Sequence, residues 1–133
     1  MRFVEVFQPK AFVMENVPNI LTIGEGIVRQ SILNDLQKLG YTVEYKVMLA
    51  SDYGVPQNRK RAVFVGFKNG THFSFPEKTV SSPVTSFEAL SDLTEGSIVD
   101  GAKYPIPATS SFQKQMRTDS CGVYNHDITI HTE

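Results

Sequence analysis

A helical pattern that lies between two strand-like segments constrains the fold of this chain more than any other feature. From residue 24 to residue 39 the apolar side chains fall on one stripe of a helix, and Gly40 follows where a left-handed C-terminal cap is expected. The continuous apolar run of residues 11–14 is typical of a strand buried on both faces, whereas residues 41–49 alternate like a half-exposed strand. The helical stripe consists of Val28, Ile32, Leu36 and Leu39.

A third strand is predicted at residues 62–67, which are almost entirely apolar. Strand, helix and strand in this order indicate a parallel βαβ unit. The third strand follows the second too closely for another helical crossover, so these two strands are expected to run antiparallel. The sequence therefore predicts an α/β fold with a mostly parallel sheet that ends in an antiparallel hairpin.

The character of the chain changes after residue 67. Asn69-Gly70 indicates a tight turn, residues 74–86 are rich in Ser, Thr and Pro, and a short helix is expected around residues 86–93. Residues 94–133 show no clear periodicity and are expected to be irregular. Three strands and one clear helix are too few to cover both faces of a central sheet, so the chain is expected to be a piece of a larger domain.

The composition is that of an ordinary globular protein, with 41% hydrophobic and 20% charged residues among 133. The formal charge of −1 gives no overall attraction to nucleic acid, so any anion site must come from a local basic cluster. No apolar run reaches the roughly 18 residues of a membrane span, and the N-terminus lacks the pattern of a signal peptide. We therefore expect neither a membrane protein nor a secreted one.

Glu15 stands at the carboxyl end of the first predicted strand, the edge at which open α/β sheets bind ligands. Its apolar neighbours are expected to exclude water from the carboxyl group and to keep it protonated near neutrality. Such a group can donate a hydrogen bond or a proton to a base nitrogen. The alternative is that Glu15 only caps the turn or pairs with a lysine. The neighbours in question are Phe12, Val13 and Val17.

Arg59 and Arg61 stand two residues apart at the start of the third predicted strand. If they begin this strand, they point to the same face together with Gln57. Two guanidinium groups on one face would form a fork for a phosphate or a carbonyl oxygen. The alternative is a solvated basic turn without a specific partner.

Taken together, the two stretches resemble the DNA cytosine-5 methyltransferase family. The segment "MENV" contains Glu15, Asn16 and Val17, which match the family's Glu-Asn-Val motif. The segment "YGVPQNRKRAVFVGF" matches its Gln-x-Arg-x-Arg motif, and the order and separation of the two motifs also agree. The resemblance covers residues 1–67 well and continues more loosely through "SSFQKQMRTDSCGVYNHDITIH".

The resemblance implies a role for each matched residue. Glu15 would contact N3 and the exocyclic amine of a flipped cytosine and supply the proton that makes C6 electrophilic. Arg61 would hold the cytosine O2 and a neighbouring phosphate, and Arg59 would support the active-site loop or a phosphate. Flipping is required because the ring atoms cannot be reached inside the duplex. The supporting positions would be Asn16, Val17 and Gln57.

The chain also departs from the family pattern. The family's nucleophilic cysteine, in a Pro-Cys context, and its glycine-rich loop for S-adenosylmethionine are both expected on segments upstream of Met1. Cys121 stands more than a hundred residues after Glu15 and does not match that nucleophile, so it is expected to be a small buried apolar residue. His126 and His131 lack the further ligands of a structural zinc site, so no metal is expected.

The fold that this resemblance implies is α/β, part of a Rossmann-like S-adenosylmethionine-dependent methyltransferase sheet followed by an irregular segment. Residues 1–75 would form the C-terminal part of the catalytic domain, and residues 76–133 would be a linker leading into the target-recognition region. The main reading is a fragment or subunit of an enzyme that methylates cytosine C5 in double-stranded DNA, inactive alone. If the chain is a subunit, another polypeptide that carries the missing motifs would complete the enzyme. The alternative is an inactive DNA-binding remnant of such an enzyme. The protein is expected in the cytoplasm if it is bacterial and in the nucleus if it is eukaryotic.

Overall fold

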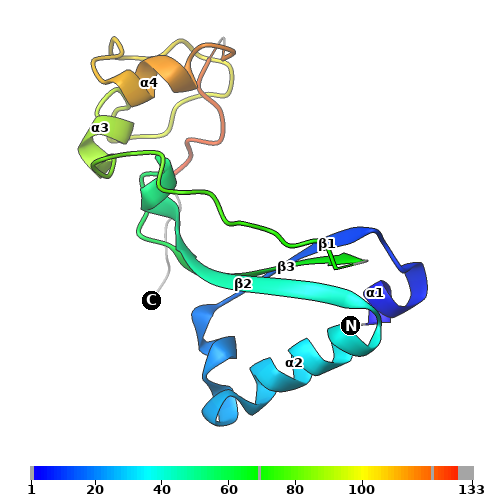
Figure 1. Cartoon of the computed structure of the whole chain (residues 1–133). Helices are drawn as coiled ribbons and strands as arrows, with labels where there is room; N and C mark the ends of the chain where they lie inside the picture. The colour runs from blue at the N-terminus through cyan, green and yellow to red at the C-terminus, as the bar shows by residue number, and fades with distance from the viewer. Residues whose placement is uncertain (1, 69, 121, 129–133) are drawn as a thin grey trace, which may run out of the picture. The chain divides into compact units, whose positions relative to one another are not determined.

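The computed structural model describes residues 2–68, 70–120 and 122–128. The chain divides into two compact units, one formed by residues 1–54 with 58–81 and the other by residues 55–57 with 82–133. Figure 1 follows the chain by colour, from the blue N-terminal helix through the sheet of the first unit to the small helices of the second. No helix in the described ranges is long and apolar enough to cross a membrane.

Among its described residues, the first unit contains one small sheet, two α-helices and three short 3-10 helices. Helix α2 begins later than predicted because residues 24–26 have positive φ angles that a helix cannot contain. The predicted cap at Gly40 is confirmed, with φ 85° and its amide bonded to the Gln37 carbonyl at 2.9 Å. In chain order the elements are α1 (Arg2–Phe7), β1 (Ala11–Asn16), η1 (Pro18–Leu21), η2 (Ile23–Gly26), α2 (Ile27–Lys38), β2 (Tyr41–Leu49), η3 (Ala50–Tyr53) and β3 (Lys60–Lys68).

The three strands lie in the order β1-β3-β2, and β3 pairs antiparallel with both neighbours. The predicted antiparallel pairing of the second and third strands is thereby confirmed. The prediction of a mostly parallel sheet is wrong: β1 and β2 point the same way, as a βαβ unit requires, but β3 lies between them. Periodicity shows which face of a strand is buried and does not show which strand lies beside it.

Helix α2 packs along one face of this sheet and forms the apolar core of the first unit (Figure 1). Leu36 and Phe64 are fully buried, and Tyr41 is nearly so. Tyr45 stacks on Phe64 with 5.4 Å between the ring centroids. Because burying one large apolar side chain contributes about 1.5–3 kcal/mol, this face supplies most of the stabilisation of the sheet.

Close packing of aromatic rings joins β1 to the same core. The Phe12 ring meets Tyr41 edge-on, 5.3 Å between centroids, and lies so close to Gly66 that a Cβ there would come within 2.2 Å of it. The Tyr41 hydroxyl donates to the Pro9 carbonyl at 2.6 Å, and burial raises the pKa of this phenol. A glycine at position 66 is therefore what lets Phe12 cover the centre of the sheet.

Strand β1 is less buried than predicted. Phe12 and Met14, which share the face of the core, are half-buried, whereas Val13 on the opposite face is 71% exposed. The expectation that this strand is buried on both faces is wrong, because β1 lies at the edge of the sheet and only one of its faces is packed.

A return segment, residues 72–80, runs back over the face of the sheet opposite α2. Phe73 stacks on Phe67 of β3, with 6.2 Å between the ring centroids. Farther along, the Thr79 amide donates to the Asp52 carbonyl at 3.1 Å, and the Tyr53 hydroxyl donates to the Pro76 carbonyl at 3.0 Å. These hydrogen bonds hold the return segment against the 3-10 helix η3, which follows β2. Of the predicted turn at 69–70, Asn69 lies outside the described residues.

The described part of the second unit contains two short helices, α3 (Ser86–Leu90) and α4 (Ser111–Met116). The predicted helix at 86–93 is confirmed but ends three residues early. The expectation that residues 94–133 are irregular is wrong for α4, which begins with a capping box formed by Ser110 and Gln113. Two isolated β-bridges, between Ile98 and His126 and between Ala102 and Val123, tie the remaining loops together.

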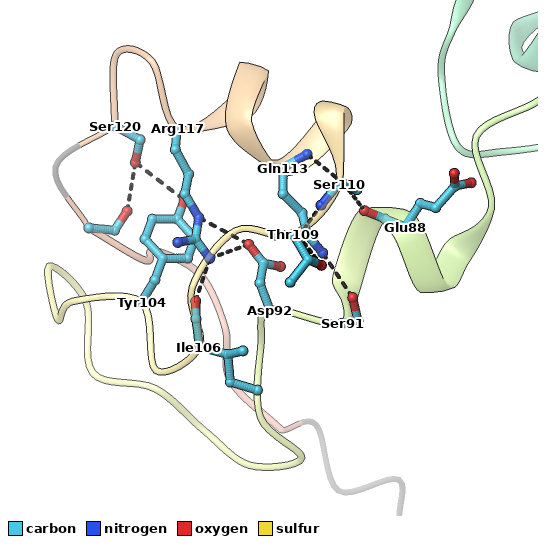
Figure 2. A network of polar contacts seen from close by, with 11 residues as sticks. Glu88, Ser91, Asp92, Tyr104, Ile106, Thr109, Ser110, Gln113, Arg117 and Ser120 are labelled. Carbon is cyan, nitrogen blue, oxygen red and sulfur yellow. Dashed lines mark hydrogen bonds and ion pairs between the residues drawn. The ribbon is translucent and has the colours of Figure 1, made fainter.

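A buried amide organises the second unit (Figure 2). Gln113 is 1% exposed, and its carbonyl oxygen accepts from the amides of Thr109 and Ser110 at 2.7 and 3.1 Å. Its Nε2 donates to the Ser91 hydroxyl at 2.9 Å, which connects α4 to the residue after α3. Buried polar groups of this kind are tolerated because every hydrogen-bonding atom has a partner.

A buried ion pair lies next to this amide (Figure 2). Asp92 is 4% exposed and accepts from the guanidinium of Arg117, whose Nη2 also donates to the Ile106 carbonyl at 2.8 Å. The guanidinium carbon lies 3.7 Å from the centroid of the Tyr104 ring. The second unit is thus held by polar contacts more than by an apolar core.

Candidate functional site

The structure brings Glu15 and Arg61 together. Glu15 lies opposite Val63 in the β1–β3 ladder, and Arg61 lies two residues from Val63, so both side chains are on the same face of the sheet. Arg61 Nε is 2.5 Å from Glu15 Oε1, and Arg61 Nη1 donates to the Lys60 carbonyl at 2.8 Å. Two groups predicted from separate motifs therefore form one charged pair.

The environment of Glu15 differs from the prediction. Its side chain is 52% exposed, and Val13 and Val17, which were expected to cover it, are 71% and 50% exposed. The expected exclusion of water from this carboxyl group is wrong for the described residues, because the face opposite α2 is open around β1. The partner of Glu15 is also an arginine rather than the lysine of the alternative.

The two residues after Glu15 shape the end of β1. Asn16 Oδ1 accepts from the Val17 amide at 2.8 Å, which turns the chain away from the sheet. Val17 then precedes η1, where Pro18 stands in the first turn. The Asn-Val pair therefore directs the backbone at the rim of the site and makes no described contact with Arg61.

Arg59 stands one residue before β3, and its carbonyl accepts from the Ala50 amide at 2.9 Å. Its side chain is exposed, as is that of Lys60, and neither has a side-chain partner among the described residues. Gln57 belongs to the short stretch 55–57 that groups with the second unit, and its amide donates to the Val55 carbonyl at 2.7 Å. Its expected position on the face of Arg59 and Arg61 stays a prediction.

Three residues near the site were not predicted from the sequence. Lys46 lies opposite Val63 in the β2–β3 ladder and so adds a cation to the face of Glu15 and Arg61. Ser51 and Asn58 are hydrogen-bonded at 3.0 Å at the base of the loop that precedes Arg59. Lys46 could have been found from the alternating pattern of its strand, whereas a bond across a loop leaves no local signal.

Two hollows described in the first unit do not fit S-adenosylmethionine. The hollow beside α2 and β2 offers amides and hydroxyls but lacks a carboxylate that could hold a ribose. The hollow at α1 is lined only by Arg2, Phe3, Val6 and Phe7. Within the described ranges there is likewise no group of three or more His, Cys, Asp or Glu side chains that could hold a metal ion, and both Cys121 and His131 lie outside those ranges.

Comparison with known proteins agrees with the resemblance seen in the two motifs. The chain is 38% identical over 145 residues to the Type II methyltransferase M.DdeI of Desulfomicrobium norvegicum, which covers 100% of this chain and 35% of that protein. It is 42% identical over 88 residues to the Type II methyltransferase M.HaeII of Haemophilus aegyptius, which covers 66% of this chain and 26% of that protein.

A solved structure of a DNA methyltransferase also matches this chain. It is described as a DNA modification methyltransferase encoded within a prophage (E. coli), with a TM-score of 0.58 and 30% identity over 77% of this chain and 30% of that chain. The chain thus spans about a third of the length of these relatives. The sequence model described as C-5 cytosine-specific DNA methylase matches residues 1–131, and the chain belongs to that family.

Proposed function

We propose that this chain is the central part of a DNA cytosine-5 methyltransferase that acts on a cytosine flipped out of the duplex. The observation that carries this proposal is the Glu15–Arg61 pair, which lies on an open face of the sheet with 2.5 Å between the two groups. The Glu15 side chain is 52% exposed and the Arg61 side chain 24%, so a ligand can reach the pair from the side of Glu15, and membership of the methylase family supports this reaction class.

The pair can address one edge of a cytosine. Glu15 in its protonated form donates to N3, which draws electrons from C6 and opens that carbon to a nucleophile. Arg61 already uses Nε on Glu15 and Nη1 on the Lys60 carbonyl, so its Nη2 hydrogens are left for the cytosine O2 or a phosphate.

The basic residues around the pair would hold the DNA backbone. Arg59 and Lys60 are exposed at the start of β3, and Lys46 lies on the same face as Arg61. Cations of this kind contact phosphates without reading the sequence. Asn16 and Val17 would shape the rim of the base pocket, and Gln57 would orient the flipped nucleotide.

This chain spans about a third of the relatives' length, so we assign the other steps of the reaction to other parts of the complete enzyme. S-adenosylmethionine supplies the methyl group when it is bound to the complete enzyme. We assign residues 1–75 to the catalytic domain and residues 76–133 to the segment that leads into target recognition. The other motifs come either from the rest of a longer chain or from a complementary polypeptide. Since the relatives are bacterial Type II methyltransferases, we place the enzyme in restriction-modification, with DNA in the bacterial cytoplasm.

A hybrid enzyme in which this chain replaces the matched part of M.DdeI would test the role of Glu15. Glu15→Gln should keep specific DNA binding but lower the single-turnover rate of methylation by roughly 10²-fold, because an amide can donate a hydrogen bond but cannot deliver the proton. The matched control is Glu44→Gln, a carboxylate that pairs with His72 on the same face of the sheet.

Near-normal methylation by the Glu15→Gln hybrid would remove Glu15 from the mechanism. The alternative function, an inactive DNA-binding remnant, predicts a different pattern, in which the parent hybrid binds DNA without methylating it. In that case Glu15→Gln changes neither property, whereas loss of the basic residues still weakens binding.

A further inference from the structure

The loop between β2 and β3 is closed at its base by two contacts that continue the strand ladder. The last paired residues are Leu49 and Lys60. The next pair in the same register is Ala50 and Arg59, joined by a backbone hydrogen bond of 2.9 Å. One step farther, the Ser51 hydroxyl donates to Asn58 Oδ1 at 3.0 Å. A side-chain hydrogen bond therefore replaces the ladder where the backbones separate.

Burial makes the Ser51–Asn58 bond hard to replace. Ser51 is 2% exposed, so in the closed loop the exposed Asn58 side chain takes the place of water as the acceptor for its hydroxyl. A buried donor that is left without an acceptor destabilises the folded state. The buried hydroxyl thus fixes the position of Asn58, the residue directly before Arg59.

The 3-10 helix η3, which contains Ser51, is also bonded to the return segment. The Asp52 carboxylate lies 3.0 Å from the Lys78 ammonium, and its backbone carbonyl accepts from Thr79. The turn η3 is therefore held from outside, and the Ser51–Asn58 bond joins it to the start of β3. Ser51 and Asn58 both belong to the first unit, whereas residues 55–57 between them group with the second unit. The Ser51–Asn58 bond therefore connects the end of β2 to the start of β3 within the first unit.

We propose that Ser51 and Asn58 are positioning residues that hold Arg59 and Arg61 in the orientation in which they meet DNA. This inference rests on the proposed function, because it takes a DNA strand as the ligand of the two arginines. Asn58 sets the backbone from which Arg59 projects, and the first pairs of β3 set the distance of Arg61 from Glu15. Without the bond, the loop opens and the arginines lose their common orientation.

The chain itself provides the test. Ser51→Ala removes the donor, Asn58→Ala removes the acceptor, and Asn58→Asp keeps an acceptor oxygen and should restore the closed loop. Ser74→Ala, at an exposed serine of the return segment, is the matched control. Trypsin, which cuts after Arg59 and Lys60, reports opening of the loop, and fluorescence anisotropy reports binding to a DNA duplex with an unpaired cytosine.

Ser51→Ala and Asn58→Ala should speed cleavage after Arg59 and Lys60 about fivefold or more, since a lost hydrogen bond lowers the free energy of local opening. The same variants should weaken DNA binding about threefold or more, whereas Ser74→Ala should match the parent in both assays. Asn58→Asp should match the parent in the trypsin assay, while its negative charge beside Arg59 by itself weakens binding to phosphates.

Unchanged cleavage in Ser51→Ala and Asn58→Ala would overturn the closure. Faster cleavage with unchanged DNA binding would overturn the positioning role and leave only a structural contact. An Arg61→Ala variant separates these results from a failure of the proposed function. If the parent chain binds no duplex, or if Arg61→Ala binds as tightly as the parent, the assignment of the arginines to DNA is wrong and the positioning role falls with it.

Discussion

At the scale of single residues, the contacts of Arg61 depend on the planar shape of its guanidinium as well as on its charge. Its guanidinium already spans Glu15 and the Lys60 carbonyl, and only a planar group with several donors can do this and still contact a ligand. Lys60 contributes charge alone, because its side chain is exposed and has no side-chain partner among the described residues. Neighbours of the same charge should therefore respond differently to substitution.

In the M.DdeI hybrid, Arg61→Lys should lose about 1–3 kcal/mol of productive base flipping, the scale of one lost bidentate contact, although the charge is kept. Lys60→Ala should leave flipping intact and make the salt dependence of DNA binding slightly shallower. Single-turnover methylation, together with fluorescence of 2-aminopurine at the target position, measures both effects. If the two variants are equally mild, the basic residues are a generic phosphate-binding patch.

At the scale of single elements, capping determines where the helices of the second unit begin. Thr85 and Glu88 form a reciprocal capping box at α3, and hydrogen bonds from the backbone amide and hydroxyl of Thr85 lower the pKa of Glu88. A five-residue helix has too little packing to form by itself, so this cap is a large part of what defines α3.

The lowered pKa of Glu88 predicts an acid-sensitive helix end. Because the pKa is lower in the folded state, the carboxylate stabilises α3 above its ordinary pKa, and this contribution disappears as the pH falls through the lowered value. Hydrogen exchange at the Thr85 and Glu88 amides should therefore gain protection as the pH rises through this acid range, after correction for intrinsic exchange. Glu88→Gln should abolish this step and Glu77→Gln should preserve it; a step that persists in Glu88→Gln has another origin.

At the scale of the whole molecule, the described residues leave large apolar side chains in solvent. Phe3, Val6 and Phe7 are each at least 66% exposed on α1, and Val13 is 71% exposed on the edge strand β1. An open strand edge beside exposed apolar side chains favours association with other chains. The span of about a third of the relatives' length agrees with such surfaces being covered in a complete enzyme.

The chain by itself should therefore self-associate at micromolar concentration. Val13→Lys should shift the distribution toward monomer, because it places a charge on the exposed face of the edge strand. Val99→Lys, at a position that is 81% exposed in the second unit, is the control and should leave association unchanged. Size-exclusion chromatography with light scattering measures both, and a monodisperse parent monomer that unfolds cooperatively would contradict this expectation.

Much of the fold was determined by local sequence. The stripe from Val28 to Leu39 and the cap at Gly40 each describe one element, and both agree with the structure. The alternation of residues 41–49 predicted a strand with the observed bounds, although burial does not alternate along β2. The capping box of Ser110 and Gln113 was also present in the sequence, but α4 was missed because six residues are too few to show a period. The motif residues pointed to the family for the same reason, since a motif is local.

Tertiary structure alone decided which elements lie side by side. Nothing in the periodicity of residues 62–67 shows that β3 lies between β1 and β2, because a strand's faces are set by its own residues while its neighbours are set by the packing of the whole sheet. The central position of β3 brings Arg61 to Glu15, and the edge position of β1 leaves the Glu15 side chain half exposed instead of buried. It also aligns Ser51 with Asn58 across a loop, a contact set by the register of two strands and by no residue within either motif.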